Sequence, residues 1–300
     1  MTANCQDPMK MWRCMVVVLL VFLEGTTNHS SAQSVHCCDS AKQGSTSPHD
    51  LTESERAAGW KLLFDGKTSQ GWRGFRRQSF PSDCWKVEKG CLHLMPDANK
   101  QKWTTCGDIV SIENFDNFEF RFEWCICPGG NSGVKYLISE DRPQSWEQAY
   151  LEYHYKDLLR EAQEDGGPAN LTSELFRYTP IGFEFQLIDD QANEDARSGP
   201  TRVTGALYDL LAPSPRPVRP AGEFNDGRIV VQGLHIEHWI NEVKVLEFER
   251  ESQQLRACIR GSKFTKMEGF GSVSRGHIDL QDHGDEIWFR NLRIRVLQAK

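Results

Sequence analysis

The amino-acid sequence predicts an all-β protein built as a sandwich, and three observations support this fold class. Short stretches with alternating apolar and polar residues recur from residue 60 to residue 296. Gly, Asn and Asp residues separate these stretches, as turns do in sandwiches and barrels. A single long stretch, 145–161, has the spacing of an amphipathic helix instead.

Nine stretches fit strands in chain order. They are 60–64, 85–94, 109–112, 118–126, 134–138, 183–188, 229–246, 277–281 and 287–296. The clearest is 118–126, where four aromatic residues and Ile126 alternate with polar residues and Cys125, which predicts one core face. The stretch 229–246 is long for one strand, and Asn241 with Glu242 predicts a hairpin reversal near its end.

Two segments interrupt the strand pattern. Ser145 and Gln148 resemble a capping box, so 145–161 is predicted to be an inserted surface helix that ends at the turn 165–168. Four proline residues between 213 and 220 predict a stiff loop outside any central strand. Long loops on a sandwich often shape a binding site, so both segments are candidates for that position.

The N-terminal region predicts an exported protein. Lys10 and Arg13 precede the uncharged stretch 14–23, and small residues end at Ala32, so 1–32 is predicted to be a signal peptide. The apolar run is too short to span a bilayer, which requires about 20 residues. A flexible lead-in is expected over 33–56, followed by the β-sandwich domain over 57–298, in the periplasm or outside the cell.

Composition limits the partners and the metal chemistry. The net charge is -7 and no run of Lys or Arg exceeds two residues, so nucleic acid is excluded as a partner, and no protein partner is predicted. Eight of the ten cysteines follow residue 32, which permits disulfides without defining their connectivity. Their spacing lacks the paired CxxC pattern of a structural zinc site.

Two polar residues share one face of the stretch 183–188. Glu184 and Gln186 alternate with Phe183 and Phe185, so a carboxylate and an amide point together from a rigid strand. A sandwich presents a polar ligand site in this way. The alternative is that both residues lie on a solvated outer face.

A second polar face is expected at the end of the stretch 277–281. His277, Asp279, Gln281 and His283 share parity if the strand continues that far. The imidazole of His283 titrates near neutral pH and suits a base, an acid or a metal ligand. A turn histidine capped by Asp282 is the alternative.

Two further candidates lie on faces that are otherwise apolar. His238 alternates with Ile236 and Ile240, which favours a hydrogen-bonded core histidine. Arg290 shares a face with Leu292 and Ile294, and an arginine there must either line a cleft or form a structural ion pair, because burying it alone is too costly.

The order of the sequence motifs resembles one known family. In chain order the motifs are Trp60-x-x-Leu63-Phe64-Asp65-Gly66-Lys67, Gly71-Trp72, Asn131-Ser132-Gly133, Gly182-Phe183-Glu184-Phe185-Gln186-x-x-Asp189, Gly205-x-x-Tyr208, Gly222-Glu223-Phe224-Asn225, Gln281-Asp282-His283-Gly284 and Phe289-Arg290-Asn291. This series, from about residue 59 to residue 297, resembles the 3-keto-disaccharide hydrolase domain. The resemblance implies a concanavalin-like jelly roll, exported by bacteria that degrade sugars.

The resemblance also implies a reaction and a set of site residues. A ketone at C3 of a sugar acidifies the C2 proton, so a base can remove it while the C1 aglycone leaves, and water then adds to the enone. The implied catalytic residues are Glu184 or His283 as base or acid, with Asp189 orienting His283 or binding a cation. Contacts to the carbohydrate substrate are expected from Asn131, Gln186, Tyr208, Asn225, His238, Gln281 and Arg290. No cofactor is certain; a divalent metal would take Glu184, Asp189 and His283 as candidate ligands.

This chain departs from the family pattern in three places. About fifty residues separate Asn131 from Glu184, Phe224 stands where the family usually has Trp, and Asn241-Glu242 replaces the usual Asn-Gly. Two other functions compete with the implied one. Nine tryptophans fit a non-catalytic, lectin-like module that stacks on sugars. A conventional two-carboxylate glycoside hydrolase is the other, although its Glu-x-Asp-x-x-Glu strand motif is missing.

Overall fold

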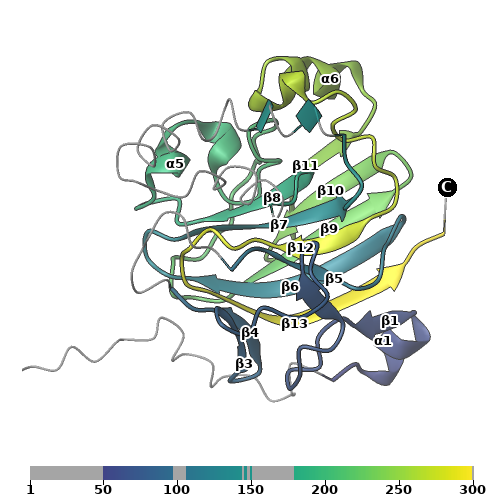
Figure 1. Cartoon of the computed structure of the whole chain (residues 1–300), viewed down its shortest axis with the longest axis vertical. Helices are drawn as coiled ribbons and strands as arrows, with labels where there is room; N and C mark the ends of the chain where they lie inside the picture. Colours follow the sequence, from purple (N-terminus) through teal and green to yellow (C-terminus); the bar gives the residue numbers. More distant parts are fainter. Residues whose placement is uncertain (1–49, 97–105, 144, 147–148, 151–178, 299–300) are drawn as a thin grey trace, which may run out of the picture. The chain divides into compact units, whose positions relative to one another are not determined.

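Antiparallel strands dominate the computed structural model, which describes residues 50–96, 106–143, 145–146, 149–150 and 179–298 (Figure 1). The strands are β1 (Trp60–Leu62), β2 (Trp72–Gly74), β3 (Trp85–Glu88), β4 (Cys91–Leu94), β5 (Ile109–Ser111), β6 (Phe118–Ile126), β7 (Asn131–Ile138), β8 (Phe183–Ile188), β9 (Asn225–Gln232), β10 (His235–Ile240), β11 (Val243–Glu249), β12 (His277–Leu280) and β13 (Ile287–Val296). They confirm the predicted all-β, jelly-roll class.

The strands form two sheets. An eight-stranded sheet has the order β11-β10-β9-β6-β13-β4-β3, with β1 paired to β13, and a five-stranded sheet has the order β2-β5-β12-β7-β8. A single cluster of buried apolar side chains joins residues of both sheets, among them Phe120 of β6, Tyr136 of β7 and Phe185 of β8. The core therefore lies between the sheets, as in a sandwich.

The alternation in β6 determines which side of the eight-stranded sheet faces the core. Phe118, Phe120, Phe122 and Trp124 are at most 1% exposed and belong to the core cluster. Gly227 on the neighbouring strand β9 leaves room for the ring of Phe122, because a β-carbon there would lie 2.3 Å from the ring. The expected core face of residues 118–126 is confirmed.

Two expected strands prove to be hairpins. Residues 85–94 divide into β3 and β4 at Lys89 and Gly90, which have φ values of 50° and 74°. The stretch 229–246 contains three strands, with the predicted reversal at Asn241 and Glu242 and a second reversal after Gln232. Asn241 and Glu242 both adopt positive φ, 47° and 65°, the backbone of a tight hairpin turn.

The helical elements with defined bounds in the described part of the chain are short. They are α1 (Glu53–Ala57), α5 (Glu194–Arg197), η1 (Pro200–Arg202), α6 (Gln253–Arg260) and η2 (Lys263–Lys266). Helix α1 begins at a capping box formed by Thr52 and Glu55, and Arg293 of β13 pairs with Glu55. Regular structure thus begins inside the segment expected to be a flexible lead-in, because the cap and this ion pair fix it to the sheet.

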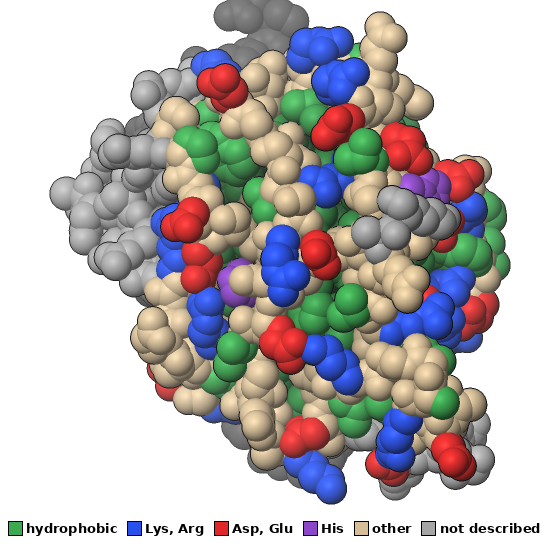
Figure 2. Space-filling view, turned by 90° about the vertical axis from the view of Figure 1, so that its right-hand side faces the viewer, with side chains coloured by type: hydrophobic (Ala, Val, Ile, Leu, Met, Phe, Trp, Pro, Cys, Tyr) green, Lys and Arg blue, Asp and Glu red, His purple; other side chains and the backbone are tan. Residues whose placement is uncertain are grey.

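Several expectations fall on residues outside the described ranges. The expected signal peptide lies wholly outside them, and so does most of the inserted helix 145–161, although residues 145–146 and 149–150 are helical. In the described part of the chain, no helix has the length and hydropathy needed to cross a membrane. Acidic and basic side chains are interspersed on the face shown in Figure 2.

The outer face of the five-stranded sheet is buried but polar. All eight residues of β7 and all four of β12 are buried, so these strands are covered on both sides. Lys135, Gln186 and Asp279 point away from the apolar core, yet they are only 4%, 1% and 0% exposed. Buried charges are rare in proteins unless they form ion pairs or belong to a functional site, so this face is a candidate site.

Candidate active site

Three charged residues form a row across the five-stranded sheet. The strand register places Lys135 of β7 directly opposite Glu184 of β8 and directly opposite Asp279 of β12. Side chains opposite each other in neighbouring strands lie on the same face. The row therefore alternates acid, base and acid on the outer face of the sheet.

Asp108, which precedes β5, completes the charge balance around Lys135. Its Oδ2 atom lies 2.6 Å from Nζ of Lys135, and Oδ1 of Asp279 lies 3.9 Å from the same nitrogen. Burial opposes the ammonium charge, but the two carboxylates outweigh it and raise the pKa of Lys135. Lys135 is therefore a fixed cation at any physiological pH.

Asp279 is the least solvated member of the row. Burial and the neighbouring Asp108 raise the pKa of Asp279 well above its ordinary value. Neither oxygen of this carboxyl has a hydrogen-bond partner among the described residues, and the same holds for Oε1 of Gln281. Unsatisfied buried polar atoms in one place are typical of a site that binds a polar ligand.

Glu184 has the environment of a general base. Burial raises the pKa of Glu184, while Lys135 and Lys263 oppose the rise. A carboxylate with a raised pKa is a better proton acceptor near neutral pH than an ordinary surface carboxylate. The amide of Gln186, in the orientation that satisfies both of its ends, donates to Oε1 of Glu184 over 3.0 Å and so holds the carboxylate in place.

Gly133 of β7 provides the space that the carboxylate of Glu184 occupies. A β-carbon at position 133 would lie 2.5 Å from Oε1 of Glu184. This contact gives the Asn131-Ser132-Gly133 motif a physical reason, because any larger residue at its third position would displace the carboxylate.

Tyr208 forms one wall beside Glu184. Its backbone N–H donates to the carbonyl of Glu184 over 3.0 Å, and its hydroxyl donates to Oδ2 of Asp195 over 2.8 Å. Arg202 pairs with Asp195 at 2.6 Å and with Asp209 at 2.8 Å, which fixes the wall. These bonds fix Tyr208 next to Glu184, and its contact with a substrate stays a prediction.

The loop after β12 forms the opposite wall. Gln281 donates its backbone N–H to the carbonyl of Gly133, and Asp282 donates its backbone N–H to Oδ1 of Asp108. The side chain of His283 is exposed by surface area, yet the loss of water around its ring lowers its pKa, and Asp285 opposes this shift. His283 is therefore neutral near pH 7. Its ring interacts electrostatically with Lys135 and Asp108.

Comparison with known proteins assigns this chain to a family. Residues 59–295 match the 3-keto-alpha-glucoside-1,2-lyase-like domain. The chain belongs to this family. A 3-keto-disaccharide hydrolase of Bacteroides thetaiotaomicron is 31% identical over 254 residues, which cover 80% of this chain and 79% of that protein.

Solved structures agree with the family assignment. A crystal structure from Parabacteroides distasonis, described as a glycosyl hydrolase, superposes with a TM-score of 0.63 at 26% identity and covers 83% of this chain and 99% of that chain. A second from the same organism has a TM-score of 0.53 at 24% identity, covers 79% of this chain and 99% of that chain, and shows the same fold.

Five of the residues expected to form the family's site come together. Glu184 and Gln186 lie on β8 and Asn131 lies on β7, and the side-chain amides of Gln186 and Asn131 approach each other to 3.3 Å. Gln281 and Tyr208 flank them through their backbone contacts to Gly133 and Glu184. His283 interacts electrostatically with Lys135 and Asp108 beside this group, and no hydrogen bond joins it to these described residues.

Asp189 does not orient His283 in this member of the 3-keto-alpha-glucoside-1,2-lyase-like family. Its carboxylate accepts hydrogen bonds from the backbone N–H groups of Gly129, Gln191 and Ala192, at 2.8, 3.0 and 3.2 Å. These bonds hold its pKa below the ordinary value although burial opposes the shift. Asp189 therefore shapes the turn after β8, and the expectation of a catalytic role is corrected.

The candidate metal ligands do not converge. Within the described ranges, the only group of three such side chains with ligand atoms within 4.8 Å of one another is His235, Glu237 and Glu247. Glu184, Asp189 and His283 form no such group, so the expected metal set is not supported by the geometry.

His238 is a core residue rather than a substrate contact. Its Nδ1 atom donates to the carbonyl of Gly205 over 3.0 Å, so its Nε2 atom accepts from the hydroxyl of Tyr136 at 2.8 Å. Burial lowers the pKa of His238 to about 4. The interpretation of this residue as a hydrogen-bonded core histidine is confirmed by these bonds.

Asn225 and Arg290 belong to the eight-stranded sheet. The side chain of Asn225 bonds to the backbone of Arg219 and to Asn241, which closes a loop. Arg290 pairs with Glu123 at 2.7 Å and stacks on Phe224, with 3.8 Å between its guanidinium carbon and the ring centroid. Both residues are structural, so the substrate contacts expected of them are corrected.

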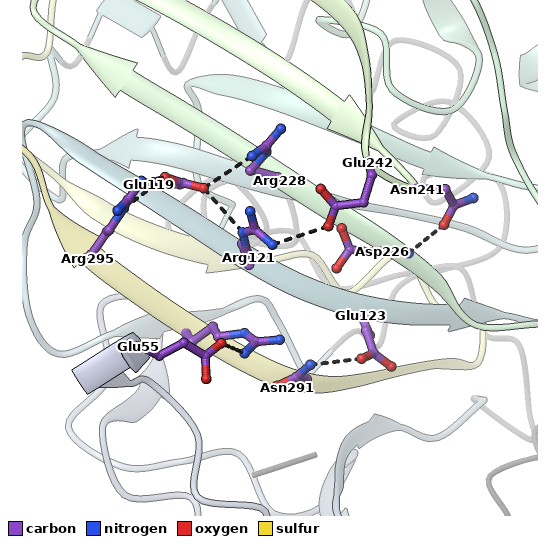
Figure 3. Close-up of polar contacts among 11 residues, drawn as sticks. Glu55, Glu119, Arg121, Glu123, Asp226, Arg228, Asn241, Glu242, Asn291 and Arg295 are labelled. Carbon is purple, nitrogen blue, oxygen red and sulfur yellow. Dashed lines mark hydrogen bonds and ion pairs between the residues drawn. The ribbon is translucent and has the colours of Figure 1, made fainter. Parts of the chain in front are cut away.

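Figure 3 shows polar contacts on the outer face of the eight-stranded sheet, around the partner of Arg290, Glu123. The polar face of the eight-stranded sheet carries ion pairs in which Glu119 bridges Arg121, Arg228 and Arg295, and Asn291 bonds to Glu123. Arg290 adds one more pair to this network through Glu123. The family motif Phe289-Arg290-Asn291 therefore contributes to the sheet and not to the site.

Sequence reasoning missed four residues that define the site: Asp108, Lys135, Asp195 and Lys263. One of them, Lys135, left a signal, because it interrupts the apolar stretch 134–138 in the middle of a strand. The others come from the loop before β5 and from the short helices α5 and η2, whose approach to the sheet depends on tertiary contacts, and no local pattern identifies them.

Proposed function

We propose that this protein is an exported enzyme that cleaves 3-keto-glycosides by elimination at C1 and C2 followed by hydration. The observation that carries the proposal is the carboxylate of Glu184, held over Gly133 beside the fixed cation Lys135 on a buried polar face. Membership of the 3-keto-alpha-glucoside-1,2-lyase-like family supports a substrate with a ketone at C3.

The reaction requires a base close to the C2 proton. The ketone at C3 makes that proton acidic, and its removal leaves an electron pair that expels the aglycone oxygen at C1. Glu184 suits the role of base because burial raises its pKa. Lys135 opposes that rise and so favours the ionised form of Glu184, which is the form that accepts a proton.

Other residues of the site bind and orient the sugar. Gln281 offers a buried oxygen without a partner among the described residues, and Gln186 fixes Glu184. Neutral His283, on the opposite wall, suits proton transfer to the leaving aglycone or from the attacking water. The ring of Tyr208 supplies an apolar wall for the sugar.

Export is supported by two features. The N-terminal 32 residues have the order of a signal peptide, with a positive flank, an apolar run and small residues at the end. A disulfide joins Cys84 to Cys106, and such bonds persist in oxidising compartments. A periplasmic or extracellular location follows from the proposal.

Aglycone release tests the proposal. The mature chain is incubated with 4-nitrophenyl 3-keto-glucoside and with the unoxidised parent glucoside, and nitrophenol is followed. Release from the keto sugar, with a loss of about 100-fold or more in Glu184→Gln, is the expected result. Binding of the parent without release of either would favour the lectin-like function. Release from the unoxidised parent at an equal rate would favour a conventional glycoside hydrolase.

A further inference from the structure

Two lysines approach Glu184, and their environments are opposite. Lys135 lies 2.6 Å from Asp108 and 3.9 Å from Asp279, and these carboxyl groups stabilise its positive charge. Lys263, on η2, has no ion pair or hydrogen bond from its ammonium group to any of the described residues, and its side chain is half-buried. Two titratable groups with such different surroundings in one site usually have different roles.

Contacts of the backbone and of an aromatic ring place Lys263 at the site. Its Nζ atom lies 4.3 Å from the ring centroid of Tyr208, the residue that bonds to the carbonyl of Glu184. The backbone N–H of Lys263 donates to Oδ2 of Asp209, which also pairs with Arg202. The amine is thus held beside the site by the same wall that positions Tyr208.

The surroundings of this amine favour its neutral form. Burial lowers the pKa of Lys263 to about 8, although Glu184 and Asp209 oppose the shift. A lysine that is partly unprotonated near neutral pH is a nucleophile, and desolvated lysines form Schiff bases with carbonyl substrates. A 3-keto sugar supplies the carbonyl group that such a lysine attacks.

We propose that Lys263 forms a Schiff base with the C3 ketone of the substrate, so that the site withdraws electrons through an iminium ion. The proposal rests on the function proposed above and deepens it, because it names the group that makes the C2 proton acidic. It is carried by the position of Nζ over Tyr208 beside Glu184, and by the absence of a charge partner among the described residues.

The steps balance without any co-reactant except water. The amine adds to C3, and loss of one water gives a protonated Schiff base. Glu184 takes the C2 proton, the electron pair forms an enamine, and the enamine expels the aglycone oxygen, which takes up a proton. Water then adds at C1, a proton returns to C2, and hydrolysis releases the 3-keto sugar and restores the amine.

Reductive trapping tests the proposal directly. The full mature chain is mixed with methyl 3-keto-α-glucoside and cyanoborohydride, and the intact mass and the peptide map are measured. We expect one covalent sugar adduct on Lys263, and none in Lys263→Arg, which keeps a positive charge but forms no Schiff base. Lys244→Arg, on the other sheet, is the matched control and is expected to give the wild-type adduct.

Kinetics separate this proposal from the proposed function. Aglycone release is expected to fall by about 100-fold or more in Lys263→Arg and Lys263→Ala, with partial rescue of Lys263→Ala by ethylamine. Wild-type release from the keto sugar without any adduct, or a Lys263→Arg rate within threefold of wild type, would overturn the Schiff base while the function stands. An adduct on a different lysine would also overturn it. No release by the wild type would refute the proposed function instead.

Discussion

Lys135 and Glu184 stand directly opposite each other on β7 and β8, so a fixed cation adjoins the candidate base. The pair defines what the buried polar face can do. Burial raises the pKa of Glu184, and the ammonium group of Lys135 reduces that rise. The two effects act on the pKa of Glu184 in opposite directions, and the effect of burial is the larger.

Replacing Lys135 by Met tests this balance. Without the ammonium group the pKa of Glu184 should rise further, so the acidic limb of the pH profile of kcat/KM should move to higher pH. We expect a loss of at least tenfold at pH 7, with partial recovery at higher pH. Lys135→Arg keeps the charge and serves as the control. An unchanged pH profile in Lys135→Met, with the fold verified by circular dichroism, would contradict the role of Lys135.

Gly133→Ala tests the space needed by Glu184. The added β-carbon would lie 2.5 Å from Oε1, and the end of a flexible side chain is the group that moves. We expect kcat to fall by about 10- to 100-fold, since a displacement near 1 Å is sufficient for such a loss. The melting temperature should change little. In the background of Glu184→Gln the same substitution should have no further effect on activity, and an equal loss there would refute the explanation.

His238 should make the protein sensitive to acid. Its pKa is about 4 in the folded state against an ordinary value of 6.5, so the unfolded chain takes up a proton first as the pH falls. Stability is thus fully present above pH 6.5 and is lost between pH 6.5 and pH 4, by on the order of 3 kcal/mol. Urea unfolding at pH 7 and pH 4.5 measures the loss. A His238→Phe/Tyr136→Phe variant removes both hydrogen-bonding partners, and its unfolding free energy should depend less on pH than that of the wild type.

Arg290→Met separates a structural arginine from a substrate contact. Its partner Glu123 and the ring of Phe224 lie on the polar face of the eight-stranded sheet. We expect the free energy of unfolding to fall by about 1 to 2 kcal/mol, while kcat/KM for the keto sugar stays within about threefold of the wild type. A selective rise in KM with unchanged stability would restore the substrate contact that the sequence suggested.

Periodic patterns in the sequence predicted most of the fold. The strands 118–126, 183–188 and 287–296 have the expected bounds, because alternation over six or more residues is a strong signal. Two hairpins were read as single strands, since Lys89-Gly90 and Gly233-Leu234 are weaker turn signals than Asn-Gly. β2 was missed because three residues are too few to establish a period.

The site was predicted only in part, for a physical reason. Glu184 and Gln186 follow from strand parity, but Asp108 lies in the loop before β5 and Lys263 lies on the short helix η2, and long-range contacts determine where both lie. Arg290 and His238 have side chains suited to binding a sugar, but they lie elsewhere. Arg290 lies on the outer face of the eight-stranded sheet, and His238 lies in the core. Residue type alone does not distinguish a buried network from a substrate pocket.

Deuterium incorporation at C2 tests the central claim most directly. The reaction is run in D₂O with a 3-keto-glucoside, and the released sugar is analysed by NMR and mass spectrometry. Elimination and hydration predict one deuteron at C2 of the product at early times, above the level in the Glu184→Gln variant and in the enzyme-free control. Release of the aglycone with protium retained at C2 would contradict proton abstraction by Glu184 and would favour displacement at C1.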